Sequence, residues 1–272
     1  MAGQLLKPKA PQWGAFFVIG LILVTNPLFA ACPAPPSESE PATVRFVSDG
    51  DTVVFGDQRR VRLIGINTPE LGHKGQLNQP LAIRARDRLR QLLLSSNHRV
   101  IVKLGQEPQD RHGRWLAHLY LPDGQHIGEQ LIREGHGWMV AVTPNITTAN
   151  CLKAAENAAR ESRQGVWSNA FYTPIKSTAL KLRTRGFHFI QGRIQQVQDR
   201  PTARWLLLNG RFSIRIPKSA LTLFTSPPDR SWIGRKITVR GWLYAHRGKL
   251  HVNLEHPAAM DIIPLEQSTT WQ

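Results

Sequence analysis

The sequence is poor in cysteine and in acidic residues. Its 272 residues include 2 cysteines, and 19 acidic residues stand against 35 lysines and arginines, which gives a formal net charge of +16 at pH 7. Two lone cysteines so far apart do not suit a metal site, and the 10 histidines show no metal-ligand spacing. So basic a chain favours a polyanionic partner, namely nucleic acid, anionic lipid or envelope glycan, over a charge that serves solubility alone.

The N-terminus has only a short apolar run. Trp13–Val24 is apolar but too short to span a bilayer comfortably, Lys7 and Lys9 precede it, and small residues follow within Pro27–Ala31. This order predicts a signal peptide at residues 1–31 and therefore export, either to the periplasm or out of the cell. The mature chain would then have no transmembrane segment. The alternative is an uncleaved membrane anchor.

The two cysteines, Cys32 and Cys151, have two interpretations. In an exported protein an even pair favours a disulfide, which would contribute about 4–5 kcal/mol by closing so long a loop. However, Leu28–Cys32 is similar to a bacterial lipoprotein cleavage site, although Phe29 stands where a small aliphatic residue is usual. Lipidation of Cys32 is therefore the alternative to the disulfide.

The first half of the mature chain has the pattern of a small β-barrel. A Pro/Ser/Glu-rich segment at residues 32–42 reads as a flexible lead-in to a domain at residues 43–168. Alternation and turn residues predict five strands, at Thr43–Val47, Thr52–Phe55, Arg60–Ile66, Arg99–Leu104 and Arg114–Leu121. Helical spacing predicts three helices, at Leu77–Leu94, Ile127–Glu134 and Asn150–Gln164, with Gly165 as the cap of the last. Five short antiparallel strands with one inserted helix are the outline of an OB barrel, so we expect a mostly β, α+β fold.

The second half predicts another barrel. Residues 169–185 have no strong periodicity and read as a linker, residues 186–264 as a small domain and residues 265–272 as a tail. Its five predicted strands are Phe187–Val197, Arg204–Leu208, Arg211–Ile216, Lys236–Leu243 and Lys249–Leu254. We expect a five-stranded β-barrel, again OB-like, that interleaves basic and aromatic residues. Such a surface can bind single-stranded nucleic acid, unless the aromatic residues form the core and the arginines the outer face. The residues concerned are Arg193, Arg204, Trp205, Arg211, Phe212, Arg215, Arg240, Trp242, Tyr244 and Arg247.

Charged residues follow several strand ends of the first barrel. Asp49 and Asp51 lie in one turn. Arg62 lies on the next strand but one and Asn67 at the exit of that strand, Glu70 follows Pro69, and Arg114 begins a further strand. Phosphodiester cleavage needs cations on the non-bridging oxygens, a metal or its equivalent, and a base for water. These strand ends can converge in a barrel, where two arginines could clamp one phosphate.

The segment from about residue 44 to residue 168 resembles the staphylococcal nuclease, or thermonuclease, family of OB-fold domains. The resemblance covers Val47–Thr52, Arg62–Glu70, Asp110–Ala117, and the stretch from Cys151–Glu156 to Gly165–Trp167, in the family's order and spacing. It implies an enzyme that cuts the bond between phosphorus and the 5′ oxygen of DNA and RNA and leaves 3′-phosphates. Single strands would be the preferred substrate.

The resemblance also implies roles for individual residues. Asp51 and the backbone carbonyl of Thr68 would ligate Ca²⁺, with Asn67 in the place of a second carboxylate ligand. Glu70 would be the general base, and Arg62 and Arg114 would bind the phosphate. Because an amide brings no charge, Asn67 should weaken Ca²⁺ binding or shift the preference toward other divalent ions.

Other positions depart from the family pattern. His112, Val140 and, nearby, Val142 stand where pocket tyrosines are expected. The candidate substrate contacts are His112 and Arg111. Asp110 is expected to shape its loop rather than to bind metal. The alternative to an enzyme is a nucleic-acid-binding envelope protein with a degenerate nuclease fold. The presence of Asp51, Glu70, Arg62 and Arg114 favours the enzyme.

Overall fold

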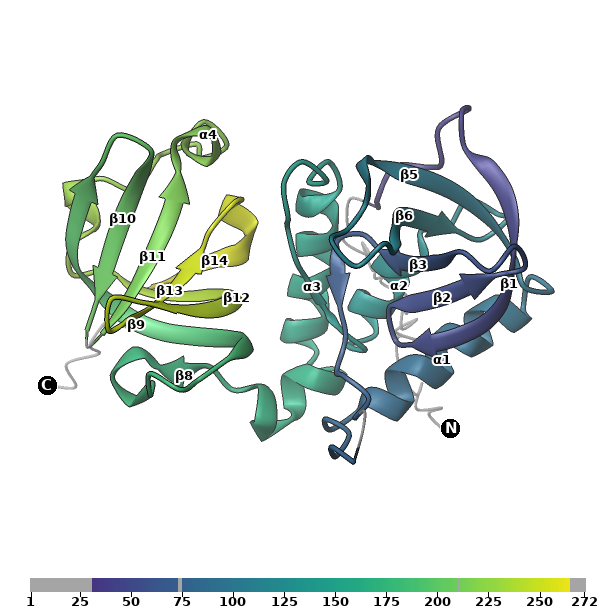
Figure 1. Ribbon diagram of the computed structural model, residues 1–272, viewed down its shortest axis with the longest axis horizontal. Helices are drawn as coiled ribbons and strands as arrows, with labels where there is room; N and C mark the ends of the chain where they lie inside the picture. Colours follow the sequence, from purple (N-terminus) through teal and green to yellow (C-terminus); the bar gives the residue numbers. More distant parts are fainter. Residues whose placement is uncertain (1–30, 73–74, 210, 265–272) are drawn as a thin grey trace, which may run out of the picture.

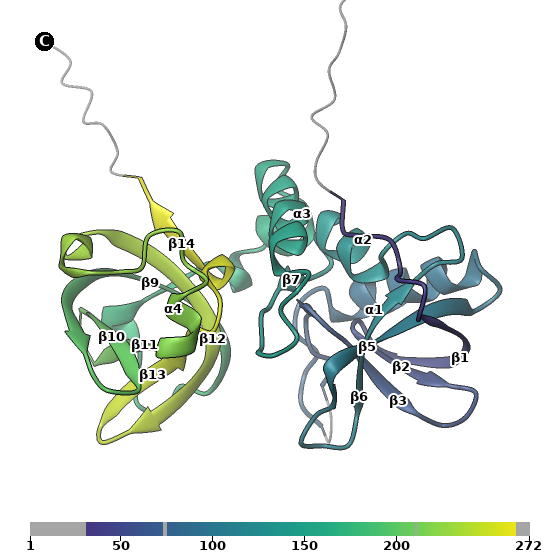
Figure 2. The same ribbon diagram turned by 90° about the horizontal axis from the view of Figure 1, so that it is seen from above.

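The computed structural model describes residues 31–72, 75–209 and 211–264. Two β-barrels lie side by side, and one helix, α3 (Ala149–Glu161), stands between them in both views (Figures 1 and 2). Almost all of the predicted signal peptide, and the predicted tail at 265–272, lie outside the described residues. No helix in the described part of the chain has the length and apolar character needed to cross a membrane.

The first barrel closes in the strand order β1-β2-β3-β6-β5. Its strands are β1 (Glu40–Asp49), β2 (Thr52–Phe55), β3 (Arg60–Leu63), β5 (Arg99–Gln109) and β6 (Trp115–Tyr120). The OB barrel predicted from the sequence is confirmed, but the expectation of five antiparallel strands is wrong for one pair: β3 and β6 are parallel, and the other pairs are antiparallel. A two-stranded ladder of β4 (Ile66–Asn67) and β7 (Trp138–Met139) carries the chain out of this barrel.

Alternating apolar residues explain the barrel's interior. Val53, Phe55, Val61, Leu63 and Leu119 are all at most 3% exposed and belong to one core. Burying side chains of this size contributes about 1.5–3 kcal/mol each, which fixes the face that each strand turns inward.

Helix α1 (Ala82–Leu94) begins five residues later than the sequence predicts. Pro80 disfavours helical backbone before it, and Leu81 has a φ of +70°, so the regular spacing of leucines does not extend the helix to Leu77. Ala85, Leu89, Leu92 and Leu93 form the buried face as expected.

The other two helices begin close to their predicted starts, but the expected cap of α3 is wrong. Helix α2 (Ile127–Arg133) is capped by His126, and α3 ends at Glu161 rather than at Gln164. Arg163 (φ +50°) turns the chain, and the Gln164 amide donates to Ala159 O at 2.8 Å. Gly165 instead allows the close approach of two backbone segments, because a Cβ there would lie 2.1 Å from the carbonyl oxygen of Gly135.

The second barrel repeats the topology of the first. Its strands are β9 (Gly186–Asp199), β10 (Ala203–Leu208), β11 (Phe212–Pro217), β12 (Lys236–His246) and β13 (Lys249–Asn253). They close as β9-β10-β11-β13-β12, with β11 and β13 parallel and the other pairs antiparallel. The third and fifth strands are thus the parallel pair in both barrels, so the second is also OB-like. Helix α4 (Lys218–Leu221) follows β11, and β14 (Met260–Ile263) pairs with β12.

The segments predicted as lead-in and linker are partly ordered. β1 starts at Glu40, where Glu40–Thr43 pair with β5, and Cys32 is bonded to Cys151. Between the barrels lie β8 (Ile175–Lys176), which pairs with β9, and the short helical turns Gly165–Ser168, Ala170–Tyr172 and Ser177–Ala179. Two further turns, Arg230–Trp232 and Pro257–Ala259, lie in the second barrel.

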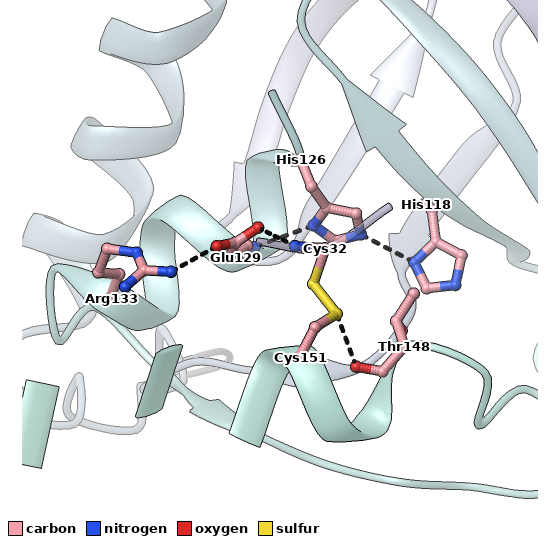
Figure 3. Close-up of a disulfide and its surroundings, with 7 residues drawn as sticks. All are labelled: Cys32, His118, His126, Glu129, Arg133, Thr148 and Cys151. Atoms are coloured by element: carbon pink, nitrogen blue, oxygen red, sulfur yellow. Dashed lines mark hydrogen bonds and ion pairs between the residues drawn. A yellow bond between two sulfur atoms is a disulfide. The ribbon is translucent and has the colours of Figure 1, made fainter. Parts of the chain in front are cut away.

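Polar side chains lie around the disulfide between Cys32 and Cys151 (Figure 3). The backbone nitrogen of Cys32 donates to Oε2 of Glu129 at 2.8 Å, and the other carboxylate oxygen accepts from Arg133 at 2.5 Å. Beside it, Nδ1 of His118 lies 3.0 Å from Nε2 of His126. Because a disulfide occupies the sulfur of Cys32, that sulfur cannot also carry a thioether-linked lipid.

Candidate active site

The charged and polar residues singled out in the sequence line one cleft of the first barrel. Asp51 lies in the β1–β2 turn, Arg62 on β3, Asn67 on β4, Glu70 in the loop after β4, and Arg114 just before β6. The cleft has a volume of about 660 Å³, and Arg111 and His112 also line it. The structure therefore brings together residues that are up to 63 positions apart in the chain.

Asp51 is the buried acid of the cleft, only 5% exposed. Its Oδ2 accepts from the backbone nitrogen of Thr68 at 3.1 Å, and its Oδ1 accepts from the hydroxyl of Thr52 at 3.0 Å. Close packing fixes this turn, because a Cβ at Gly50 would lie 2.6 Å from Oγ1 of Thr68.

Arg62 links the buried acid to the amide at the strand end. Its Nη1 lies 2.7 Å from Oδ2 of Asp51, and its Nη2 donates to Oδ1 of Asn67 at 2.8 Å. The guanidinium thus rests on the two side chains that were expected to ligate metal. Asn67 contributes an acceptor oxygen but no charge to this contact.

Glu70 lines the cleft with an exposed side chain. Partial desolvation of its carboxyl by the surrounding protein, together with the charges of Asp51 and Asp49, raises the pKa of Glu70 to about 7 against the opposing effect of Arg62 and Arg114. Burial also raises the pKa of Asp49, with a smaller contribution from the charge of Asp51. Three carboxyls therefore lie close enough to influence one another.

Asp110, in the loop before β6, holds Arg114 in position. Asp110 Oδ1 accepts from the backbone nitrogens of His112 and Arg114, and Oδ2 lies 2.8 Å from Nε of Arg114. Asp110 thus shapes the loop and holds the guanidinium. Arg111 and His112 are exposed on that loop and contact each other at 3.2 Å.

The donors expected for a cation fit a hard metal ion. Within the described ranges, no three His, Cys, Asp or Glu side chains gather as a metal cluster. The available set is one carboxylate (Asp51), one amide oxygen (Asn67) and one backbone carbonyl (Thr68), and these oxygen donors suit Ca²⁺. That a guanidinium already lies on Asp51 and Asn67 shows that this position favours positive charge.

Trp242 is a residue of this site that its sequence motifs do not predict. Trp242 lies on β12 of the second barrel and lines the same cleft as Arg62 and Glu70. Its basic and aromatic neighbourhood was visible in the sequence, but only the packing of the two barrels brings it to the site. Other members of that surface lie elsewhere: Phe212 is core, and Arg240 is buried in an ion-pair cluster.

Comparison with known proteins places the first barrel in a family. Residues 60–169 match the family described as staphylococcal nuclease homologue. An uncharacterised endonuclease of Escherichia coli O157:H7 is 30% identical over 131 residues, which are 47% of this chain and 77% of that protein. The thermonuclease of Staphylococcus intermedius is 32% identical over 127 residues (46% of this chain, 74% of that protein), and that of Staphylococcus hyicus is 27% identical over 167 residues (57% and 96%).

The fold and the cleft thus define an OB-fold nuclease, that is, a phosphodiester hydrolase acting on nucleic acid. The chain belongs to the staphylococcal nuclease family.

Proposed function

We propose that this protein is an exported, Ca²⁺-dependent endonuclease that hydrolyses DNA and RNA to products with 3′-phosphates. Its nuclease domain would span residues 43–168, with an OB-like domain at residues 186–264 that holds substrate. The observation that carries the proposal is the position of Arg62, Glu70 and Arg114 around one cleft beside Asp51. Two cations, a carboxyl with raised pKa and oxygen donors for a metal are what this hydrolysis needs.

In this mechanism the guanidinium groups of Arg62 and Arg114 bind the non-bridging oxygens of the scissile phosphate. Glu70 accepts a proton from a water molecule, whose oxygen forms a new bond to phosphorus. The bond from phosphorus to the 5′ oxygen breaks, and that oxygen leaves with the electron pair and takes up a proton from solvent. Charge gained by the phosphate in the transition state is stabilised by the two arginines.

Asp51, Asn67 and the carbonyl of Thr68 would hold Ca²⁺, which supplies positive charge beside the phosphate. Arg62 would then exchange its contacts with Asp51 and Asn67 for contacts with the phosphate. Arg111 and His112, exposed on the rim of the cleft, would contact the substrate next to the cleaved bond.

The test is digestion of single-stranded DNA and RNA by the mature protein with Ca²⁺, Mg²⁺, Mn²⁺ or EDTA. Glu70→Gln and Arg62→Ala should each reduce kcat/KM at least about a hundredfold, because each removes a group that acts in the transition state. Arg90→Ala, on the exposed side of α1, is the matched control and should digest normally.

The alternative is a nucleic-acid-binding protein whose nuclease site is inactive. Asn67 favours it, because the cation site has one negative charge fewer than a pair of carboxylates would give. Salt-sensitive binding of the same oligonucleotides without cleavage under any metal would establish this alternative.

Export is supported by the environment of Cys32. A disulfide suits an oxidising compartment. If processing ends after Ala31, the Cys32 nitrogen that donates to Glu129 becomes a charged α-amino group and the contact becomes an ion pair. N-terminal sequencing of the exported protein should therefore begin at Cys32. A fatty acid on Cys32 would instead establish a lipoprotein.

A further inference from the structure

Trp242 lies where two cavities of the molecule meet. Its side chain is 47% exposed, although it is among the largest apolar groups of the second barrel. It lines the active-site cleft, and it also lines a second cavity of about 380 Å³. Asn67 and Glu70 line both cavities as well. A strand of nucleic acid that leaves the cleft past Glu70 would therefore meet Trp242.

The two cavities differ in chemistry. The active-site cleft is lined by four arginines and five acidic residues, and of its described lining residues only Trp242 is a phenylalanine, tyrosine or tryptophan. The described lining of the second cavity contains no lysine or arginine and six such aromatic residues, namely Trp138, Phe171, Tyr172, Phe187, Phe189 and Trp242. Cations suit the phosphates of a nucleic acid and aromatic rings suit its bases. The division predicts phosphate in the cleft and base in the second cavity.

The ring of Trp242 is held in place by other aromatic rings. Phe187 meets it edge to face, with ring centroids 4.9 Å apart and planes at 78°. Phe187 in turn stacks on Trp138 at 5.5 Å, and Trp138 pairs with Asn67 in the β4–β7 ladder. A continuous series of contacts therefore fixes the tryptophan relative to the strand that carries Asn67. A ring that is already held loses little conformational entropy when it binds a ligand.

We propose that Trp242 is a stacking platform for an unpaired nucleobase next to the cleaved phosphate, so that the second barrel sets the preference for single strands. This inference rests on the proposed nuclease function. A base within a duplex is stacked on its neighbours and cannot offer its face to Trp242, whereas a base in a single strand can. The ligand is thus a single-stranded DNA or RNA segment that places its phosphate among the arginines and its base on this ring.

The experiment compares Trp242→Leu, which keeps an apolar side chain, with Trp242→Phe, which keeps an aromatic face. Phe224→Leu is the control, because Phe224 is a half-buried aromatic residue of the same domain that packs against the core of the second barrel and lines neither cavity. All variants are made in the Glu70→Gln background, so that binding is measured without cleavage. The probes are a fluorescein-labelled single-stranded octathymidylate, the same oligonucleotide with one abasic sugar, and a hairpin duplex, each followed by fluorescence anisotropy with Ca²⁺.

Trp242→Leu should weaken binding of the single strand roughly tenfold to a hundredfold, the size of one base–aromatic stack. Trp242→Phe should retain most of the parent's affinity for the single strand. Neither substitution should change the affinity for the hairpin. The abasic oligonucleotide should bind the parent protein more weakly, with little further loss in Trp242→Leu, because the missing base and the missing ring are one interaction.

Equal affinities of Trp242→Leu and Phe224→Leu for the single strand would overturn the inference. So would an equal loss of hairpin binding, because the platform would then not read unpaired bases. Cleavage by the protein with Glu70 intact is measured separately. If the protein cleaves nucleic acid but Trp242→Leu does not weaken binding, the stacking role of Trp242 is refuted and the nuclease function is not. If the protein does not cleave but Trp242→Leu weakens binding, the nuclease function is refuted and the stacking role is not.

Discussion

Arg240 of the second barrel forms an ion pair with Glu156 of helix α3, and their side chains are only 2% and 0% exposed. Glu156 Oε2 also accepts from the backbone nitrogen of Met139 at 2.9 Å, in the strand that pairs with β4. Although burial alone would raise the pKa of Glu156, the charges of Arg240, Lys153 and Arg160 hold it at about 2. This contact therefore connects the second barrel to the strand that carries Asn67.

Arg240→Met should destabilise the protein by about 3 kcal/mol or more, because it leaves a buried carboxylate without its main partner. The free energy of unfolding from a urea titration measures this. Lys236→Met, at an exposed position of the same strand, should change it by less than about 0.5 kcal/mol. The double variant Arg240→Met with Glu156→Leu should recover part of the loss. Equal stabilities of Arg240→Met and Lys236→Met would contradict this account.

Asn67→Asp should strengthen Ca²⁺ binding by about tenfold or more, because it adds a negative charge to the expected ligand set. Calorimetric titration with Ca²⁺ measures this without relying on activity. Asn97→Asp, in an exposed turn, is the control for the added charge and should leave the affinity unchanged. If Asn67→Asp binds Ca²⁺ no better than the parent, Asn67 is not a ligand.

The buried pair His118 and His126 should make the protein sensitive to acid. Burial lowers the pKa of His118 to about 3 and that of His126 to about 4. Below pH 6.5 the unfolded chain takes up protons that the folded chain does not, so stability falls as the pH decreases toward 4. Each histidine contributes up to about 1.4 kcal/mol per pH unit over that range, and nothing above it.

Urea titrations at pH 7.5, 5.5 and 4.5 measure this dependence. His126→Asn removes one of the two groups and should flatten the dependence. His246→Gln, at an exposed position, should leave the slope unchanged. A parent slope that does not exceed that of His126→Asn would refute the role of the pair.

Loss of the disulfide should cost about 5 kcal/mol in the chain-entropy model, because Cys32 and Cys151 are 119 residues apart. The variant Cys32→Ser with Cys151→Ser should unfold at a much lower urea concentration, and a reducing agent should lower the midpoint of the parent to match it. An unchanged midpoint in the double variant, or a non-reducing peptide map without this bridge, would contradict the pairing.

The sequence alone determined the type of each barrel and most residues of the cleft. Alternating apolar residues and turn signals predict the strands, because side-chain burial fixes the face of each strand. The motifs around Asp51, Arg62, Glu70 and Arg114 indicate phosphodiester cleavage, because they occur in the order and spacing of the nuclease family. Helix ends were less predictable. Leu81 and Arg163 adopt positive φ values that neither residue type signals.

Which residues lie at the contact between the two barrels follows only from their packing. Neither the burial of Arg240 against Glu156 nor the position of Trp242 beside Glu70 follows from local pattern, because each depends on packing between segments more than 80 residues apart. In the sequence Arg240 and Trp242 are two members of one basic and aromatic strand. Packing against α3 buries the first in an ion pair and leaves the second half-exposed at the active-site cleft.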